Sequence, residues 1–493
     1  MQDEHSTPEP PRDSKTSDAA STNPPGDKPR PAETPSRQGC LRWGLVILAF
    51  LMTAPCLCCC GGWLYWNRQA QQAAEAELAL IREAGEPVEI ADLKSITSRT
   101  GGESDAADLW RQAFEELDAP AFVADSEAIP QLFSNGTYLP TPHAYWPDED
   151  AAAQFLGDHA DLLELLHQAS QQGTGEFDIS YTKGGLMEFK YLSSAQRAFR
   201  LLKLKAYYDA HTGDTAGAAG ALRDTLSMAA LLQQQPSFIP QLVAAACIGS
   251  VWSSLQDLMP GNEWGEQDLL ATQEALRGLD PKAGLKTALL GERVLAIYSF
   301  SFVEDISQEN PEDGRIEVKR HEDLAYTLKN FRELVAATDL PWPALLASGK
   351  TLESQMKQET SGLGGVRYVV TATVFPPVSV VLVAGARTEA FLATARAGIA
   401  LERFRQQTGA FPQTLAELAP DWLPTVPLDP FDGQSLRYHP PANETDYATV
   451  FSVGENIKDD GANPSDDADG IPLDLVFRVS TPPKNRSVPP AKE

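Results

Sequence analysis

The pattern of apolar positions predicts one membrane-spanning segment near the start of the chain, followed by a long series of amphipathic helices. Residues 43–66 contain no charged side chain, and 24 residues are enough to cross a hydrocarbon core about 30 Å thick. Aromatic rings stand at both ends of the segment, as they do at the two interfaces of a bilayer. We therefore predict a single transmembrane helix. A cleaved signal peptide is the alternative, but the segment is longer than a signal peptide's apolar core and no small-residue cleavage site follows it.

The charges that flank this segment predict its orientation. Basic residues are more frequent before the segment than directly after it: Lys28, Arg30, Arg37 and Arg42 against Arg68 and Arg82. Because positive flanks stay on the cytoplasmic side, we expect residues 1–42 in the cytoplasm and the bulk of the chain outside. Residues 1–39 are rich in Pro, Ser, Thr, Asp and Lys, and such a composition predicts a disordered tail.

Apolar residues recur at helical spacing over most of residues 67–385. Residues 68–83 are strong helix formers that continue the span as a stalk, and Gly85 and Pro87 end them. Within residues 194–232, two amphipathic helices meet at Gly213, which ends one helix before Asp214 or Thr215 caps the next. This pair resembles a tetratricopeptide-type hairpin, but no repeat of about 34 residues indicates an array. Further helices are expected at roughly 266–278, 283–304 and 321–337.

The part from residue 386 onward combines one long helix with three strand-like runs. The helix is expected from roughly Arg387 to Thr408, with Gly409 as its stop. The runs are SLRYH, YATVFSV and LDLVFRV, and alternation in the second predicts an antiparallel sheet with one face against the helix. The uncharged run 368–386 before the helix is interrupted by two prolines. We interpret it as a buried core segment, with a second membrane span as the alternative.

These patterns predict a mainly α protein with an N-terminal single transmembrane helix and a helical-hairpin extracytoplasmic domain. A small α+β module with an antiparallel sheet follows at the C-terminal end. The expected divisions are a disordered cytoplasmic tail, the transmembrane helix, the helical domain, the α+β module and a second disordered tail: 1–42, 43–66, 67–385, 386–481 and 482–493.

Charge and cysteine content narrow the range of partners. The chain has 68 acidic and 40 basic residues, a net charge of −28, and most of the excess lies beyond residue 66. A surface this negative repels phosphate backbones, so we exclude a nucleic-acid partner, whereas cations and basic proteins stay compatible. Only Cys247 lies in the large outer part, so no disulfide can form within it. The other five cysteines lie in or beside the span, and we interpret four of them, Cys56 and Cys58–Cys60, as small apolar filler; lipid attachment and metal binding are the alternatives.

The C-terminal module carries a family-like pattern in three pieces. The helix ends with Ala400, Leu401, Phe404, Gly409, Phe411 and Pro412 in an "ALxxYxxxxGxYP" arrangement. A turn of the "DPWGxxxxY" type is matched by Asp429, Pro430, Phe431, Gly433 and Tyr438. The ending "YSxGxDGxxGGxxxxxDI" is echoed by residues 451–454, 459–461 and 474–475. The module thus resembles the C-terminal domain of the major pseudopilin of type II secretion systems, and the whole chain is similar to large bacterial membrane-anchored proteins. No prepilin processing site precedes the module, and the predicted span lies far upstream of it.

The resemblance implies a calcium site in the loop before the last strand, because that loop binds calcium in the pseudopilin family. The corresponding residues here are five aspartates that offer hard oxygen ligands: Asp459, Asp460, Asp466, Asp467 and Asp469. The loop does not follow the EF-hand pattern, since Ser465 stands at the first position and Val476 at the last. A solvated acidic loop without a metal is the alternative.

Two classes of function are open from the sequence. The first is a membrane-anchored scaffold or protein-interaction protein of the cell envelope, in contact with the lipid bilayer and with envelope proteins, and related to secretion through the resemblance. The absence of nucleophile elbows, P-loops, HExxH and paired CxxC motifs favours it. The second is a membrane-tethered enzyme whose site lies between helices near Glu292 and Arg293. A tuned acid at Glu292 would serve such a site, whereas structural partners inside a helical bundle are the alternative.

Overall fold

The structure is a computed structural model, and it divides the chain into two units, Met1–Tyr65 and Trp66–Glu493. The residues that it describes are 61–97, 105–129, 139–142, 144–172, 190–260, 262–309, 320–362, 367–375, 377–443, 446–467 and 470–480. Most of the predicted transmembrane helix, both predicted disordered tails and Asp469 therefore lie outside the described residues. Residues 61–83 are helical throughout, as predicted for the end of the span and the stalk.

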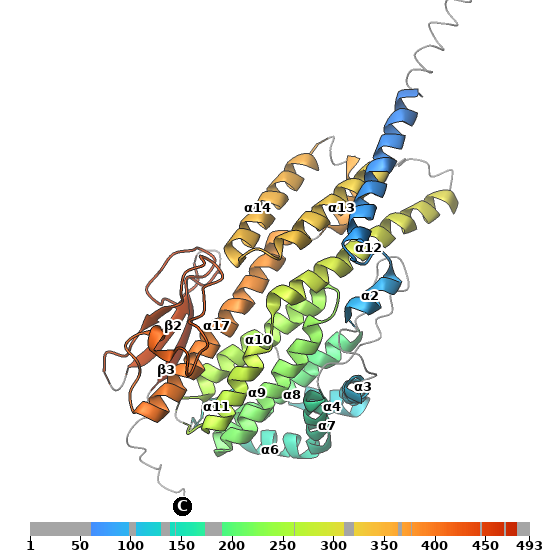
Figure 1. Cartoon of the computed structure of the whole chain (residues 1–493). Helices are drawn as coiled ribbons and strands as arrows, with labels where there is room; N and C mark the ends of the chain where they lie inside the picture. The colour runs from blue at the N-terminus through green and yellow to red at the C-terminus, as the bar shows by residue number, and fades with distance from the viewer. Residues whose placement is uncertain are drawn as a thin grey trace, which may run out of the picture. The chain divides into compact units, whose positions relative to one another are not determined.

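The described part of the second unit is mainly helical, with a small sheet near its C-terminal end (Figure 1). Its helices are α2 (Ile90–Thr97), α3 (Asp105–Leu117), α4 (Pro120–Ala128), α6 (Glu149–Asp158), α7 (Ala160–Gln171), α8 (Lys190–Thr212), α9 (Thr215–Gln233), α10 (Phe238–Leu258), α11 (Glu266–Arg277), α12 (Pro281–Glu309), α13 (Arg320–Ala337), α14 (Trp342–Glu359), α16 (Val369–Val374) and α17 (Val378–Thr408). A short 3-10 turn, η2 (Leu415–Leu418), and three strands, β1 (Arg437–His439), β2 (Tyr447–Ser452) and β3 (Leu475–Ser480), complete it.

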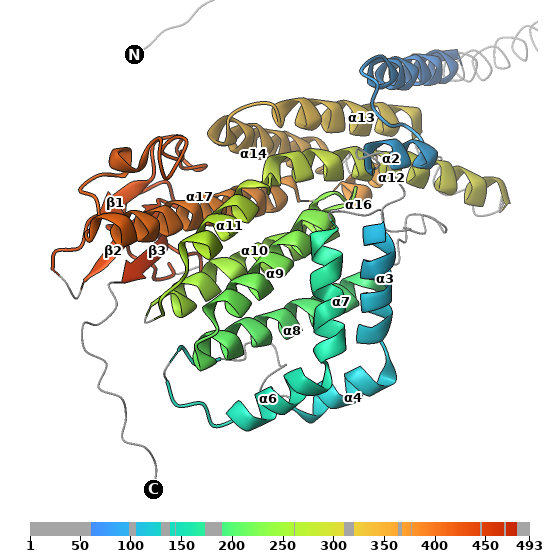
Figure 2. The same ribbon diagram turned by 60° about the horizontal axis from the view of Figure 1, so that its bottom comes forward.

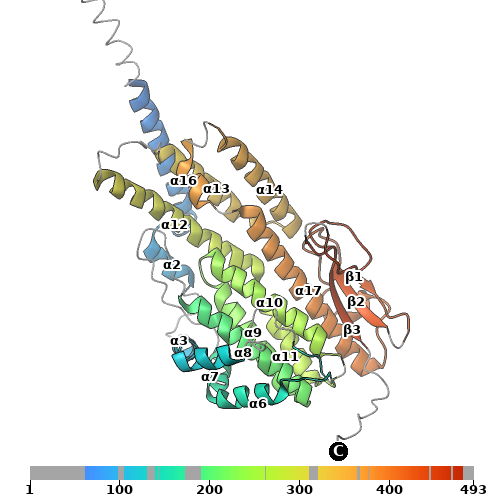
Figure 3. The same ribbon diagram turned by 180° about the vertical axis from the view of Figure 1, so that it is seen from behind.

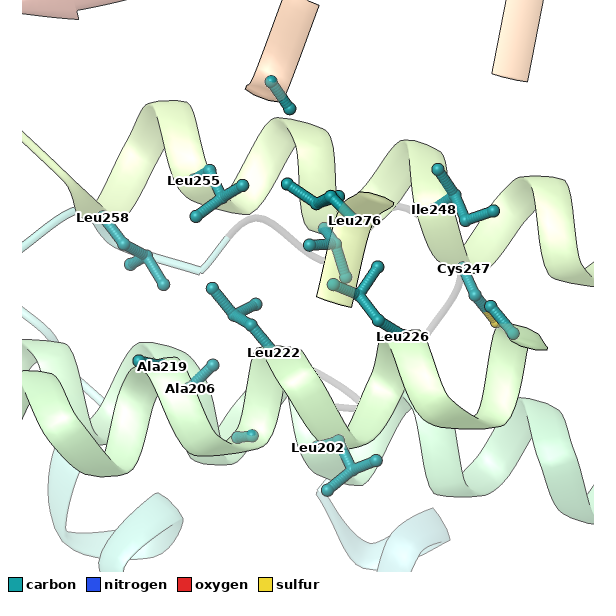
Figure 4. Packing of buried hydrophobic residues seen from close by; sticks show 14 of the residues in the cluster. Leu202, Ala206, Ala219, Leu222, Leu226, Cys247, Ile248, Leu255, Leu258 and Leu276 are labelled. Atoms are coloured by element: carbon teal, nitrogen blue, oxygen red, sulfur yellow. The ribbon is translucent and has the colours of Figure 1, made fainter. Parts of the chain in front are cut away.

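The core of the unit is built on the predicted hairpin of α8 and α9. Gly213 adopts a left-handed φ of 90°, and the Asp214 side chain accepts a hydrogen bond from the Gly217 N–H at 2.9 Å, so Asp214 is the cap. Helix α10 packs beside the hairpin (Figure 2). Figure 4 shows Leu222 and Leu226 of α9 pointing toward α10, where they meet its buried apolar face.

Helix α17 is longer than the sequence predicted. It begins at Val378, directly after Pro377, and not near Arg387, because the apolar run 378–386 continues the helix with one side buried against α12 and α14. The prolines do interrupt the uncharged run, since α16 ends before them. Gly409 ends α17 with a φ of 83°. Helices α10 and α17 are both long and apolar enough to cross a membrane, but 44% and 56% of their most apolar stretches are buried inside the protein, as in core helices.

The sheet has the order β1-β2-β3 and is antiparallel throughout, as predicted. One correction concerns its faces. The alternation of Tyr447, Thr449, Phe451 and Val453 suggested the face toward the helix, but the residues of β2 that share the apolar cluster of α17 are Ala448 and Val450. β2 is the central strand, and both of its faces are buried after its first residue. The alternation of apolar and polar residues therefore did not show which face of β2 meets α17.

Candidate functional site

Three arginines of the helical body contact the stalk, which we define as residues 66–87. The Arg293 side chain, fully buried on α12, donates from Nη1 to Glu86 Oε2 at 2.6 Å and from Nη2 to the Pro87 carbonyl at 3.1 Å. Arg332 on α13 donates from Nε to Glu77 Oε2 at 2.8 Å. The guanidinium of Arg367 lies 5.5 Å from the ring centroid of Trp66. Helix propensity alone would not determine the position of the stalk relative to the body. These three contacts determine it.

Glu292 faces a different neighbour from Arg293. Its carboxylate accepts hydrogen bonds from the Ser237 hydroxyl at 2.8 Å and the Phe238 N–H at 2.9 Å, and thereby satisfies the first turn of α10. Burial raises the pKa of Glu292, although these two donors oppose the shift. Gly291 is needed beside it, because a Cβ atom there would lie 1.8 Å from the Pro236 carbonyl oxygen.

Glu292 and Arg293 therefore both have structural partners, and they point to separate neighbours. Burial lowers the pKa of Arg293, and the hydrogen bond to Glu86 opposes that effect. An enzyme site near these two residues would need at least one of them to face a substrate. The contacts instead favour the alternative that both belong to the framework of the helical bundle.

The acidic loop predicted to bind calcium is organised in the structure by a different aspartate. Asp459, Asp460 and Asp466 are exposed, and Asp467 is half-buried. Asp474, which is buried just before β3, accepts hydrogen bonds from the N–H groups of Asn463 at 2.9 Å and Asp460 at 3.4 Å.

The predicted ligands make mostly local contacts. Asp459 Oδ1 accepts the Gly461 N–H at 3.0 Å, and Asp467 Oδ1 accepts the Ile471 N–H at 3.0 Å. Within the described part of the chain, no three Asp, Glu, His or Cys side chains lie close enough together to hold a metal ion. Since Asp469 lies outside the described residues, calcium binding stays a prediction.

Asp429, in the turn that resembles the pseudopilin motif, is the most highly connected carboxylate of the module. It is fully buried, and its two oxygens accept hydrogen bonds from Phe431 N (3.0 Å), Ser452 Oγ (2.8 Å), Val453 N (2.8 Å) and Arg437 Nη1 (3.2 Å). Burial raises its pKa, and the N–H donors oppose the shift. The motif thus closes the turn and fastens it to the end of β2. Tyr438, the last residue of the motif, donates to the Pro412 carbonyl at 2.9 Å.

Sequence reasoning missed a group in which a buried serine and a partly exposed histidine both meet a buried aspartate. Asp224 of α9 is buried; it accepts the Ser170 hydroxyl, and its carboxylate lies 3.1 Å from His167 Nδ1. Burial raises the pKa of Asp224. A nucleophile would need its hydroxyl proton aimed at the histidine, but here both Ser170 and His167 meet the carboxylate. The group therefore joins α7 to α9, and only the fold could have brought residues 54 positions apart together.

The surface of the described residues includes two hollows of several hundred Å³. A groove of about 590 Å³ lies between α13 and α14 and is lined mainly by small and apolar side chains. A second, of about 360 Å³, lies between α11, α17 and the loop after η2, and Arg277, Arg396 and Arg403 line it. Each of these arginines has a carboxylate partner: Glu274, Glu389 and Glu266, respectively. The local charge is thereby balanced, and neither hollow gathers the unpaired polar groups expected of an active site.

No protein-family model, no curated protein and no solved structure matches this chain. The pseudopilin resemblance therefore stays a prediction that is based on the motif residues.

Proposed function

We propose that this chain is a membrane-anchored scaffold that holds an extracytoplasmic, protein-binding body at the surface of the cell membrane. The observation that carries the proposal is the attachment of the stalk. The stalk continues an uncharged run of bilayer length, and Arg293, Arg332 and Arg367 fasten it to three separate parts of the body. Such an attachment holds the body in one position on its stalk, which a scaffold needs and a freely tethered enzyme does not.

The state of the buried polar groups supports a scaffold over an enzyme. Glu292, Arg293, Asp224 and Asp429 each bind groups of neighbouring elements. A catalytic group is usually held with one polar atom facing a hollow that substrate can enter. Among the described residues, the groove between α13 and α14 is lined mainly by small and apolar side chains, and the arginines in the hollow between α11 and α17 have carboxylate partners.

The C-terminal module supports a link with envelope assemblies related to secretion. The helix α17, the turn at Asp429 and the three strands occur in the order that the pseudopilin resemblance implies. We propose that the module is a rigid partner-binding end of the scaffold, and that its acidic loop contacts basic groups or calcium. Incorporation into a pilus is not part of the proposal, because no processing site precedes the module.

Membrane extraction and protease access test the anchor and its orientation. The full chain is expected to stay with membranes in alkaline carbonate, and protease added to spheroplasts is expected to remove the body. A matched variant carries Leu51→Arg and Leu57→Arg on either side of the middle of the uncharged run, and an arginine costs about 2.5–3.5 kcal/mol at the centre of a span. This variant should wash off. Release of the unaltered chain by carbonate, or protection of the body in spheroplasts, would contradict the proposal.

Proximity labelling tests the scaffold itself. A labelling enzyme fused after Glu493 should mark a small, reproducible set of envelope proteins in the native host, and the arginine variant should lose that set. A turnover assay that depended on Glu292 would instead favour the enzyme.

A further inference from the structure

The uncharged run 368–386 leaves part of its surface exposed in the structure. Its buried side packs into the body, since Val370, Val378 and Leu382 are buried. On the outer side, Ala372, Thr373, Pro377 and Val380 are exposed, and Val380 is 61% exposed. The exposed side chains come from α16 and from the first turn of α17, and none of the 19 residues is charged in a chain of net charge −28. The exposed side chains of this face are therefore uncharged, which is compatible with contact with the headgroup region of a bilayer.

Helix α16 is firmly attached to α13 (Figure 3). The buried Asp323 of α13 accepts the N–H groups of Val370 at 2.9 Å and Thr371 at 3.1 Å, which satisfies the start of α16. The rings of Phe331 and Phe375 lie 4.5 Å apart at its other end. The first turn of α17 is held in the same way, because Glu353 of α14 accepts the Ser379 N–H at 3.0 Å. The exposed face therefore has a defined position on the body.

The same face is tied to the residue that ends the predicted span. Arg367, directly before α16, places its guanidinium 5.5 Å from the Trp66 ring centroid and 5.3 Å from that of Tyr368. Arg367 also pairs with Glu322 at the start of α13. Trp, Tyr and Arg are the residues that occupy the headgroup region of a bilayer, since each has an apolar body and a polar end. If Trp66 lies at that level, Arg367 and Tyr368 lie there as well.

We propose that residues 367–375 and 377–380 form a second membrane contact, in which α16 and the first turn of α17 rest in the interfacial layer of the bilayer. The contact does not span the membrane, because the prolines interrupt the run and α17 leads into the body. It adds apolar side chains and the Arg367–Tyr368 pair to the anchor at Trp66. The inference rests on the proposed membrane anchor, and it specifies which side of the body faces the lipid.

Site-specific photo-crosslinking to lipid tests this contact. The full chain is reconstituted in phosphatidylcholine vesicles that contain a tagged lipid, with p-benzoylphenylalanine introduced at one position at a time. The test positions are Thr373 and Val380, which are exposed and make room for a large ring. Leu64 serves as the reference for the anchor. Tyr447, which is 47% exposed on β2, serves as the control away from the membrane. Tyr447 lies on β2, which pairs with β3, and Phe477 of β3 contacts α17 at Gly398. Gly398 lies about 27 Å from Val380 along the axis of α17.

We expect lipid adducts at Thr373, Val380 and Leu64, and only background yield at Tyr447. Adducts at Leu64 alone would overturn the second contact and leave the anchor in place. No adduct at any of the four positions would overturn both. A crosslinked dimer at Thr373 or Val380 would show that a second copy covers this face, and lipid yield at Tyr447 equal to that at Val380 would show that the face is not singled out; either result overturns the proposal.

Discussion

The contacts of the stalk with the helical body and the turns of the C-terminal module hold their charged groups in different ways. In the body, arginines of α12 and α13 bind carboxylates of the stalk, so each contact is an ion pair between distant parts of the chain. In the module, Asp429 and Asp474 accept mainly backbone N–H and hydroxyl groups from their own turns and strands. Charge pairs thus attach the stalk to the body, whereas Asp429 and Asp474 shape the loops of the module; the body uses the second arrangement at helix starts, as at Glu292 and Asp323. The two devices should respond differently to substitution.

The largest effect is expected at Asp429 in the module. Asp429→Ala removes the acceptor of four donors and leaves the buried Phe431 N–H, Val453 N–H and Ser452 hydroxyl without it, which should cost about 3–5 kcal/mol of the free energy of unfolding, although Arg437 keeps its pair with Asp432. Urea unfolding of the full chain in detergent micelles, followed with limited proteolysis of the module, measures the loss. The exposed Asp421 provides the control, and Asp421→Ala should change stability by less than about 0.5 kcal/mol.

If Asp429→Ala does not fold, a milder variant, Asp429→Asn, tests the same prediction. Asp429→Asn retains one acceptor oxygen and loses the charge, so its cost should fall between those of Asp421→Ala and Asp429→Ala. Equal stability of Asp429→Asn and the unaltered chain would show that the turn does not depend on a charged acceptor.

The same difference explains what the sequence could predict. The partners of Asp429 lie 2, 8, 23 and 24 residues away, so the motif, the turn and the following strands were visible as one local pattern. The pairs Glu86–Arg293 and Glu77–Arg332 join residues 207 and 255 positions apart, and no local pattern marks them. The hairpin at Gly213 and the strands were predictable for the same reason. The early start of α17 was not, because a proline-bounded apolar run fits both a core segment and a helix.

The ion pair of Arg293 predicts an asymmetry between its two partners. Glu86→Ala leaves the fully buried Arg293 guanidinium with the Pro87 carbonyl as its one acceptor among the described residues, and should lower the free energy of unfolding by about 3 kcal/mol. Arg293→Met should lower the free energy of unfolding by only about 1 kcal/mol, because the methionine side chain fills the space of the arginine. The Glu86 carboxylate that is left is partly exposed, so water can solvate it. Hydrogen exchange at the N–H groups of the stalk measures both. An equal or reversed order would show that the pair does not act as a buried charge on the arginine side.

Two helical glycines should respond to alanine substitution with changes in stability of opposite sign, because one is closely packed against the sheet and the other is not. A Cβ atom at Gly398 would lie 2.2 Å from Phe477 Cε1, so Gly398→Ala forces the helix and the sheet apart and should cost about 1–3 kcal/mol. At Gly220 of α9 a Cβ atom meets nothing within 4 Å, and Gly220→Ala should stabilise the chain by about 0.5–1 kcal/mol. Thermal unfolding of both variants measures the two signs. Stabilisation by Gly398→Ala would show that the helix and sheet are less closely packed than the structure has them.

The smallest expected change in stability is the one that calcium produces by binding to the acidic loop. Its measurement shows whether the module is stabilised by a metal ion in addition to its own hydrogen bonds. With a dissociation constant of about 10⁻⁴–10⁻³ M, typical of extracellular sites, 1 mM calcium should stabilise the module by about 0.4–1.4 kcal/mol. The melting temperature of the full chain is compared with calcium, with magnesium and with a chelator. Asp459→Asn combined with Asp460→Asn should abolish the calcium shift, whereas Asp421→Asn should not. Without any calcium shift, the N–H groups bound by Asp474 are sufficient to hold the loop, and the module resembles the pseudopilin in its turn at Asp429 but not in its metal.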